Sequence, residues 1–133
     1  MEYHDLLVKA DQCDDPVLRL IYVAVFNIAL HNCTHRRISK PFNPLLGETF
    51  ELRSPDYNYI SEQVSHHPPI SACYAIDHNK TYKFWRNTYV KTSFTGTSVK
   101  IIPLGQGSVR LERRNEEYTI HYPPTYVHNL ILG

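Results

Sequence analysis

This chain of 133 residues has little of several features that mark other classes of protein. It has only three cysteines, an odd number at wide spacing without a CxxC pair, which argues against a structural zinc site. Such cysteine usage is typical of a reduced, cytosolic protein. The net charge is only +1 with histidine neutral, whereas nucleic-acid-binding proteins carry a strong basic excess. We therefore expect no metal, no cofactor and no nucleic-acid partner.

The sequence also lacks a membrane-spanning segment and a signal peptide. The longest strongly apolar stretch, residues 18–30, contains Arg19 and is too short to span a bilayer. Residues 1–10 are charged and polar, unlike a secretory signal. Hydrophobic residues nevertheless make up 42% of the chain and charged residues 20%, which is ordinary for a domain that buries a core. We therefore expect one soluble domain.

The N-terminal part of the sequence predicts helices over about residues 3–32. Residues 2–10 allow a short helix with one apolar face. An acidic pair at 14–15 precedes Pro16, and an acidic N-cap followed by proline is a strong helix-start signal. Residues 17–32 are apolar almost all round, which is typical of a helix buried on most sides. Their β-branched residues leave a strand as the alternative, but the length favours a helix.

Beyond residue 48 the sequence changes to short runs of β-forming residues separated by turn residues. Residues 78–80 read as a hairpin turn, and Gly105, Gly107 and Asn115 mark later breaks. Strands at this spacing predict an antiparallel meander in a mainly β protein with N-terminal helices. The predicted strands are Thr49–Arg53, Tyr59–Val64, Ile70–Asp77, Thr81–Val90, Thr92–Ile102, Ser108–Arg114, Glu117–Tyr122 and Tyr126–Leu132.

Residues 62–69, with the sequence EQVSHHPP, contain the strongest candidate for a binding site. Pro68 and Pro69 donate no hydrogen bond and have a fixed φ, so the chain must leave a sheet there. The residue before a proline is held extended, which stiffens His67 next to His66. A rigid pair of imidazole donors suits an anionic oxygen cluster such as a phosphate. The alternatives are a pair that only caps backbone carbonyls and, less favoured, a metal site, because neighbours in an extended chain point to opposite faces.

A second candidate lies in the proline-rich segment 36–48, which two prolines and a glycine exclude from a regular helix. Lys40 is a point charge that can reach a phosphate, and Asn43 can both donate and accept a hydrogen bond. Composition alone favours the simpler interpretation, a solvated loop cation and a turn-forming asparagine before Pro44. The segment is predicted to be an ordered loop.

These segments also carry a resemblance to a known family. Residues 62–69 match, over eight consecutive positions, the fingerprint of the oxysterol-binding-protein-related family, which this sequence resembles. The block at 40–49, KPFNPLLGET, also looks like a family block, and the helix start at 13–16 does so more loosely. The resemblance covers essentially the whole chain and changes the weight given to the second candidate.

The resemblance implies a fold, a function and a set of ligands. The implied fold is a large, incomplete antiparallel barrel whose tunnel holds one lipid at a time. Several family members exchange a sterol or phosphatidylserine for phosphatidylinositol 4-phosphate between membranes. Carried over by motif, Lys40 and Asn43 would bind the inositol headgroup, and His66 and His67 would bind its 4-phosphate. We accordingly expect a cytoplasmic lipid-transfer protein that is peripheral at organelle membranes and is not an enzyme.

Two departures from the family pattern limit that expectation. The family's lid lies upstream of the helix pair, and further headgroup ligands lie beyond Gly133. Residues 1–133 therefore resemble the N-terminal half of the lipid-binding domain, with helices at about 3–32, a contact loop at 36–48 and a meander at 49–133. The sequence ends within an apolar run, which predicts a truncated product that self-associates through unpaired strand edges.

Two rival functions remain open at this point. One is a regulatory or interaction fragment that has no transfer activity and binds partners through a strand edge. The other is a phosphoinositide-hydrolysing enzyme that uses a histidine. The sequence contains no CxxxxxR phosphatase loop, no GxSxG elbow and no HExxH motif, which makes the enzyme the weaker rival.

Overall fold

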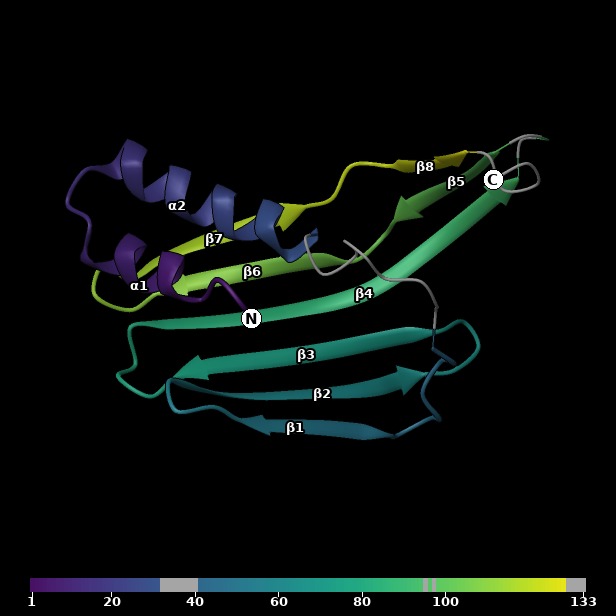
Figure 1. Cartoon of the computed structure of the whole chain (residues 1–133), viewed down its shortest axis with the longest axis horizontal. Coiled ribbons are helices and arrows are strands. Elements are labelled where there is room, and N and C mark those ends of the chain that lie inside the picture. The colour runs from purple at the N-terminus through teal and green to yellow at the C-terminus, as the bar shows by residue number, and fades with distance from the viewer. Residues whose placement is uncertain (32–40, 95, 97, 129–133) are drawn as a thin grey trace.

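The computed structural model describes residues 1–31, 41–94, 96 and 98–128. Within these ranges, two helices precede eight strands that belong to one antiparallel sheet. Figure 1 shows both helices on the same side of the strands, and the sheet is open at both edges. The prediction of a mainly β fold with N-terminal helices is confirmed.

The two helices are α1 (Asp5–Gln12) and α2 (Pro16–Ala29). The predicted start of α2 is confirmed, because the Asp15 carboxylate accepts hydrogen bonds from the backbone N–H groups of Val17 and Leu18, at 2.8 and 3.3 Å. Two of the N–H groups that have no partner within the helix are thereby satisfied.

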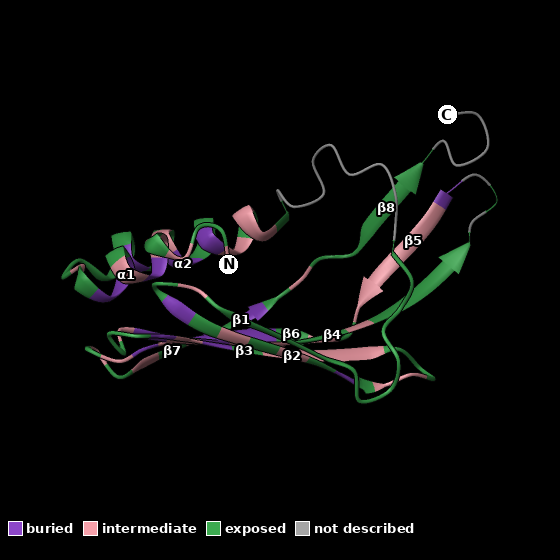
Figure 2. Ribbon diagram, turned by 60° about the horizontal axis from the view of Figure 1, so that its bottom comes forward, coloured by how far each residue is buried: buried purple, intermediate pink, exposed green. Residues whose placement is uncertain are grey.

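Helix α2 is buried along one face only, which corrects the expectation of a helix buried on most sides. Its buried residues are Arg19, Val23 and Phe26, whereas Val17 is 65% exposed and Ile28 is 68% exposed. Figure 2 shows α2 on one side of the sheet with both buried and exposed residues along it. An apolar composition all round the helix thus identified a helix without identifying which side the sheet covers.

The strands are β1 (Thr49–Arg53), β2 (Tyr57–Ser65), β3 (Ile70–Asp77), β4 (Tyr82–Phe94), β5 (Ser98–Pro103), β6 (Gln106–Leu111), β7 (Glu116–His121) and β8 (Thr125–His128). Several predicted boundaries are wrong: β6 ends at Leu111 rather than Arg114 and contains Gly107, which was predicted to be a break, and β4 continues past Val90 to Phe94. The turn lies instead around Gly96, whose φ of +84° is a left-handed conformation that glycine adopts without steric cost.

β5 and β6 together form one bent partner for the long strand β4. β5 pairs with the C-terminal half of β4 and β6 with its N-terminal half. The register is the same in both halves, since Arg86 lies opposite Gly107 and Val90 lies opposite Pro103. The order of pairing therefore remains that of a meander, with an interruption between β5 and β6.

Gly105 occupies this interruption. The backbone N–H groups of Leu104 and Gly105 both donate to the carbonyl oxygen of Tyr89, at 2.8 and 3.2 Å. A Cβ atom on Gly105 would lie 2.3 Å from the backbone oxygen of Asn87, which is closer than atoms can approach. Glycine is thus required where the sheet bends.

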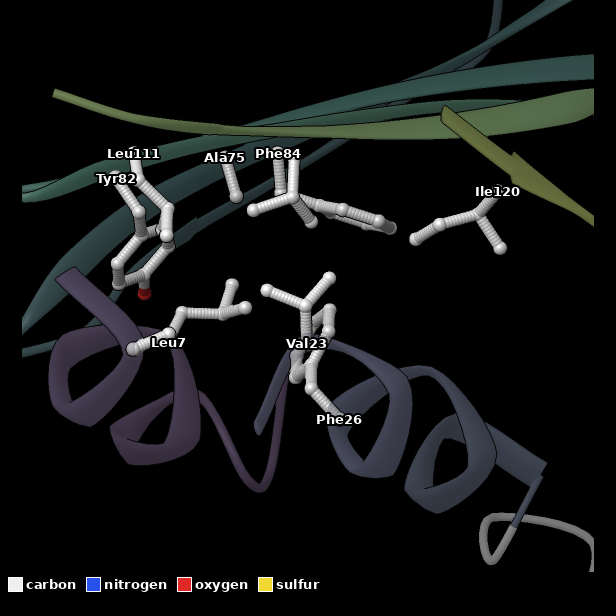
Figure 3. Packing of buried hydrophobic residues seen from close by; sticks show 10 residues of the cluster. Leu7, Val23, Phe26, Ala75, Tyr82, Phe84, Leu111 and Ile120 are labelled. Carbon is white, nitrogen blue, oxygen red and sulfur yellow. The ribbon is translucent and has the colours of Figure 1, made fainter. Parts of the chain in front are cut away.

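The core lies between the helices and one face of the sheet. Figure 3 shows Leu7, Val23 and Phe26 of the helices pointing toward side chains of the strands, including Tyr82 and Phe84. Phe26 and Phe84 pack edge to face with ring centroids 5.5 Å apart, an arrangement that contributes roughly 0.5–1.5 kcal/mol beyond the burial of the rings. This packing sets the position of α2 above the sheet.

An ion pair fastens α2 to β7. Arg19, only 5% exposed, donates from Nε and Nη2 to the two carboxylate oxygens of Glu116, at 2.7 and 2.8 Å. Its Nη1 donates to the backbone oxygen of Cys13 at 2.7 Å. The hydrogen bonds from Arg19 and from the Tyr118 hydroxyl lower the pKa of Glu116, so this carboxylate remains charged well into the acidic range.

Candidate lipid-binding site

The two histidines lie in the turn between β2 and β3. β2 ends at Ser65 and β3 begins at Ile70, so the chain leaves the sheet where the proline pair predicts that it must. The turn consists of His66, His67 and the two prolines. This placement presents the imidazoles at an end of the sheet rather than within a strand.

The rings of His66 and His67 lie together, with centroids 4.7 Å apart and planes inclined by 72°. His66 is half-buried, and its Nδ1 lies 3.0 Å from the carbonyl oxygen of Pro44, whereas His67 is exposed. A carbonyl oxygen only accepts, so Nδ1 of His66 carries the proton in this contact. The Nε2 atom of His66 then accepts when the ring is neutral and donates when the ring is an imidazolium.

A buried glutamine holds the strand just before this turn. Gln63 is 2% exposed, its side-chain nitrogen donates to the carbonyl oxygen of Ser65 at 2.9 Å, and the Ser71 hydroxyl donates to its side-chain oxygen. These bonds span the irregularity in register between Gln63 and Ser65. The sequence analysis did not single out Gln63, because its burial depends on the strands around it.

Residues 44–48 of the proline-rich segment lie against the same strand. The backbone N–H of Gly47 donates to the carbonyl oxygen of Gln63 at 2.8 Å, and the N–H of Gln63 donates to that of Glu48 at 3.0 Å. The Pro44 carbonyl contacts His66 as described above. The structure therefore brings the two predicted motifs together, although they are well separated in the sequence.

The structure describes three of the four predicted site residues. Asn43 is exposed and directly precedes Pro44, whose carbonyl oxygen contacts His66. Lys40 lies outside the described residues. Asn43 thus lies in the proline-rich segment, and His66 and His67 lie in the turn that contacts it. Their roles in binding a ligand remain predictions.

A cavity lies on the side of the sheet that the helices cover. Its volume is about 250 Å³, and its walls include Ala29 and Leu30 at the end of α2 together with Tyr59, Cys73 and Phe84 from the strands. Burial raises the pKa of Tyr59 to about 12 and also raises that of the Cys73 thiol. Both groups are therefore uncharged near neutral pH, whereas Glu2 and Arg86 add charged side chains to the same wall.

A second cavity, of about 200 Å³, adjoins the first. Arg86 and Thr88 line both cavities, and the second also contains Ile101 and Tyr122. A hollow of about 460 Å³ lies over Trp85 and its strand neighbours on β2 and β3, but the sheet alone forms it. The first cavity has walls from both layers of the fold and is better suited to exclude water from an apolar ligand, whereas the second is lined by strands, their connections and His31.

Comparison with known proteins identifies the family. The family model described as Oxysterol-binding protein matches residues 1–133. The chain belongs to this family. Human oxysterol-binding protein-related protein 7 is 42% identical over 136 residues, covering 100% of this chain and 16% of that protein. Oxysterol-binding protein-related protein 3B of Arabidopsis thaliana is 43% identical over 134 residues, covering 100% of this chain and 29% of the relative.

Solved structures show the same relationship in three dimensions. The crystal structure of the Osh1 ORD domain in complex with ergosterol matches with a TM-score of 0.88 and 40% identity, over 99% of this chain and 32% of that one. The Osh3 ORD of Saccharomyces cerevisiae in complex with PI(4)P matches with a TM-score of 0.87 and 32% identity, over 99% and 36%. The open sheet of this chain is part of the family's incomplete barrel, as predicted, and the chain spans about a third of these domains.

Two further features of the described residues bear on the site. No helix within the described ranges is long and apolar enough to cross a membrane. Among the same residues, no group of three or more histidine, cysteine, aspartate or glutamate side chains is placed to hold a metal ion.

Proposed function

We propose that this chain forms part of a lipid-binding domain that carries lipids between membranes. The chain covers about a third of the related domains, so the activity of the whole domain is part of the proposal. Related domains have been solved with ergosterol, with cholesterol and with PI(4)P. The observation that carries the proposal is the paired arrangement of the His66–His67 turn and the proline-rich loop, which forms a polar site separate from the apolar cavities.

The polar site is proposed to bind the headgroup of phosphatidylinositol 4-phosphate. With its Nδ1 directed at the Pro44 carbonyl, His66 offers Nε2 to a phosphate oxygen, and it donates there as an imidazolium. His67 is exposed and lies close enough to share the same anion. Lys40 and Asn43 supply a positive charge and an amide to the inositol ring.

The cavities beneath the helices are proposed to hold the apolar part of a sterol or phospholipid. The larger of the two has walls from α2 and from the sheet, so a ligand there contacts both layers, and the smaller one adjoins it at Arg86 and Thr88. Removal of apolar surface from water stabilises the complex by about 25 cal/mol per Å². Binding and release of this kind require no covalent chemistry, and we propose a carrier rather than an enzyme.

The proposed setting is the cytoplasm, with peripheral contact at organelle membranes. A second candidate function is supported by β1, whose five residues are all exposed and which, within the described chain, pairs on one side only. Such an edge can add a strand from another protein or from a second copy of this chain. Sedimentation over a concentration series distinguishes self-association from a monomeric carrier.

The headgroup assignment is tested with the double substitution His66→Ala and His67→Ala. We expect binding to vesicles of phosphatidylcholine and phosphatidylinositol 4-phosphate to weaken by about tenfold or more, because charge-assisted hydrogen bonds are lost. Binding of cholesterol should change little. Equal loss of both lipids would show that the pair supports the fold and does not recognise phosphate.

The chain offers a matched control in His78. Its Nδ1 also lies 3.0 Å from a proline carbonyl oxygen, that of Pro55, and it also directly follows a strand. His78→Ala removes the same kind of contact at a different turn. It should leave both lipids bound as in the wild type, and a loss like that of the double variant would mean that histidine–carbonyl contacts act through stability.

A further inference from the structure

The inner wall of the two cavities contains the charged side chain of Arg86, and Glu2 also lines the larger cavity. Arg86 lies opposite Cys73 on one side and Gly107 on the other, on the sheet face that the helices cover. Its guanidinium carbon lies 4.4 Å from the centre of the Tyr122 ring, a cation–π contact. Throughout the part of the chain that the structure describes, no carboxylate lies within ion-pair distance of Arg86.

Two polar atoms at this point are buried without a hydrogen-bond partner among the described residues. They are Nε of Arg86 and the hydroxyl oxygen of Tyr122. The Tyr122 hydroxyl lies close to the backbone of Gly107. A Cβ atom added to this glycine would lie only 2.9 Å from the hydroxyl oxygen. A buried polar group without a partner costs about 1–3 kcal/mol, and more if it is charged. Such a cost is offset when a ligand supplies the missing partner.

The surroundings define the kind of ligand that fits. Around Arg86 and Tyr122, the cavity walls include Phe84, Val90 and Ile101, which are apolar. A suitable ligand therefore has an apolar body and an oxygen atom at one end that accepts a hydrogen bond. An anionic oxygen would be bound most strongly, because it would form a charge-assisted hydrogen bond with the guanidinium of Arg86.

We propose that Arg86 and Tyr122 form an internal anchor that binds the polar oxygen of a lipid held beneath the helices. The inference rests on the proposed lipid-binding function and assigns the ligand chemistry within that site. The anchor is separate from the histidine turn, which is proposed to bind the phosphate of a headgroup. The oxygen is either a sterol hydroxyl or an acyl carboxylate, which share the same acceptor chemistry.

The test compares ligand pairs that differ in the oxygen alone. Cholesterol is compared with cholest-5-ene, which lacks the hydroxyl, and oleate is compared with octadecene. In the wild-type protein we expect the oxygen-containing member of at least one pair to bind about tenfold more tightly, which corresponds to 1.4 kcal/mol. A preference in the sterol pair alone assigns a hydroxyl, and one in the acyl pair alone assigns a carboxylate.

Three substitutions connect that preference to the anchor. Arg86→Met keeps the length of the side chain without its donors, and Tyr122→Phe keeps the ring without its hydroxyl. Both should reduce the oxygen preference toward unity while the oxygen-free ligand binds as before. The control is Arg53→Met, which removes an exposed arginine from β1 and should preserve the preference. Tyr122→Phe removes a hydroxyl that has no hydrogen-bond partner among the described residues, so it tests the anchor even if Arg86→Met disturbs folding.

The outcomes separate the two proposals. If the wild-type protein binds none of the four ligands, the proposal that the cavities hold the apolar part of a lipid fails. If it binds them without regard to the oxygen, or if Arg86→Met and Tyr122→Phe keep the full preference, the anchor is refuted and lipid binding stands. Loss of binding for every ligand in Tyr122→Phe would also refute the anchor, because it would indicate a role in packing.

Discussion

The hydrogen bonds of Gln63 provide a direct test of how the histidine turn is held. In Gln63→Met the side chain keeps its approximate volume but loses the bond to the Ser65 carbonyl and the bond from the Ser71 hydroxyl. Each buried hydrogen bond contributes about 1 kcal/mol net, so the substitution should lower the free energy of unfolding by about 2 kcal/mol. Ser71→Ala removes only the second bond and should cost about 1 kcal/mol.

The two substitutions should not be additive, because they remove one bond in common. The double variant should lose about 2 kcal/mol rather than about 3, which gives a coupling energy of about 1 kcal/mol. Urea denaturation of the four proteins, followed by circular dichroism, measures these values. Strict additivity would refute the argument, because it would mean that the contact between Gln63 and Ser71 contributes nothing to stability.

The same variants test whether the hydrogen bonds of Gln63 also support the proposed phosphoinositide site. If Gln63 positions the turn, Gln63→Met should weaken binding of phosphatidylinositol 4-phosphate at a temperature where the variant is fully folded. Cholesterol binding is the internal control, since the cavities lie beneath the helices. Loss of stability with unchanged headgroup binding would show that the hydrogen bonds of Gln63 stabilise the sheet and do not position the turn.

Two further predictions concern charge. The hydrogen bond from Arg19 lowers the pKa of Glu116 below its ordinary value of 4.5, so its contribution to stability is fully present above that pH and is lost as the pH falls through the lowered pKa of the folded state. Glu116→Gln should therefore flatten the acid limb of a plot of urea midpoint against pH, and an unchanged limb would contradict this account. Lys40→Ala should weaken phosphoinositide binding more at low salt than at high salt, because exposed charges are screened. An effect that is independent of salt would point to loop geometry instead.

The sequence by itself determined the features that depend on neighbours along the chain. Asp15 and Pro16 define the start of α2 through capping and a fixed φ, and both act within one turn of helix. Pro68 and Pro69 end β2 because they cannot donate to a strand ladder. The family was also evident from the contiguous block at residues 62–69, since a motif of adjacent residues is visible without a structure.

Tertiary structure decided which face of α2 is buried and where β4 ends. Residues 17–32 are apolar almost all round, yet the burial of one face of α2 depends on where the sheet lies. β4 extends to Phe94 because β5 pairs with it to that point, an arrangement that the β-forming character of both segments did not specify.

The candidate site shows the same division. The histidine pair was evident as adjacent residues, but the contact of His66 with Pro44 joins residues 22 positions apart. The contact of Arg86 with Tyr122 likewise depends on the pairing of β4, β6 and β7. Arg86 in particular carries no local signal, because a charged residue in a strand ordinarily faces water. Whether such a residue is solvated or enclosed depends on the layer that packs above it, and only the folded chain determines that layer.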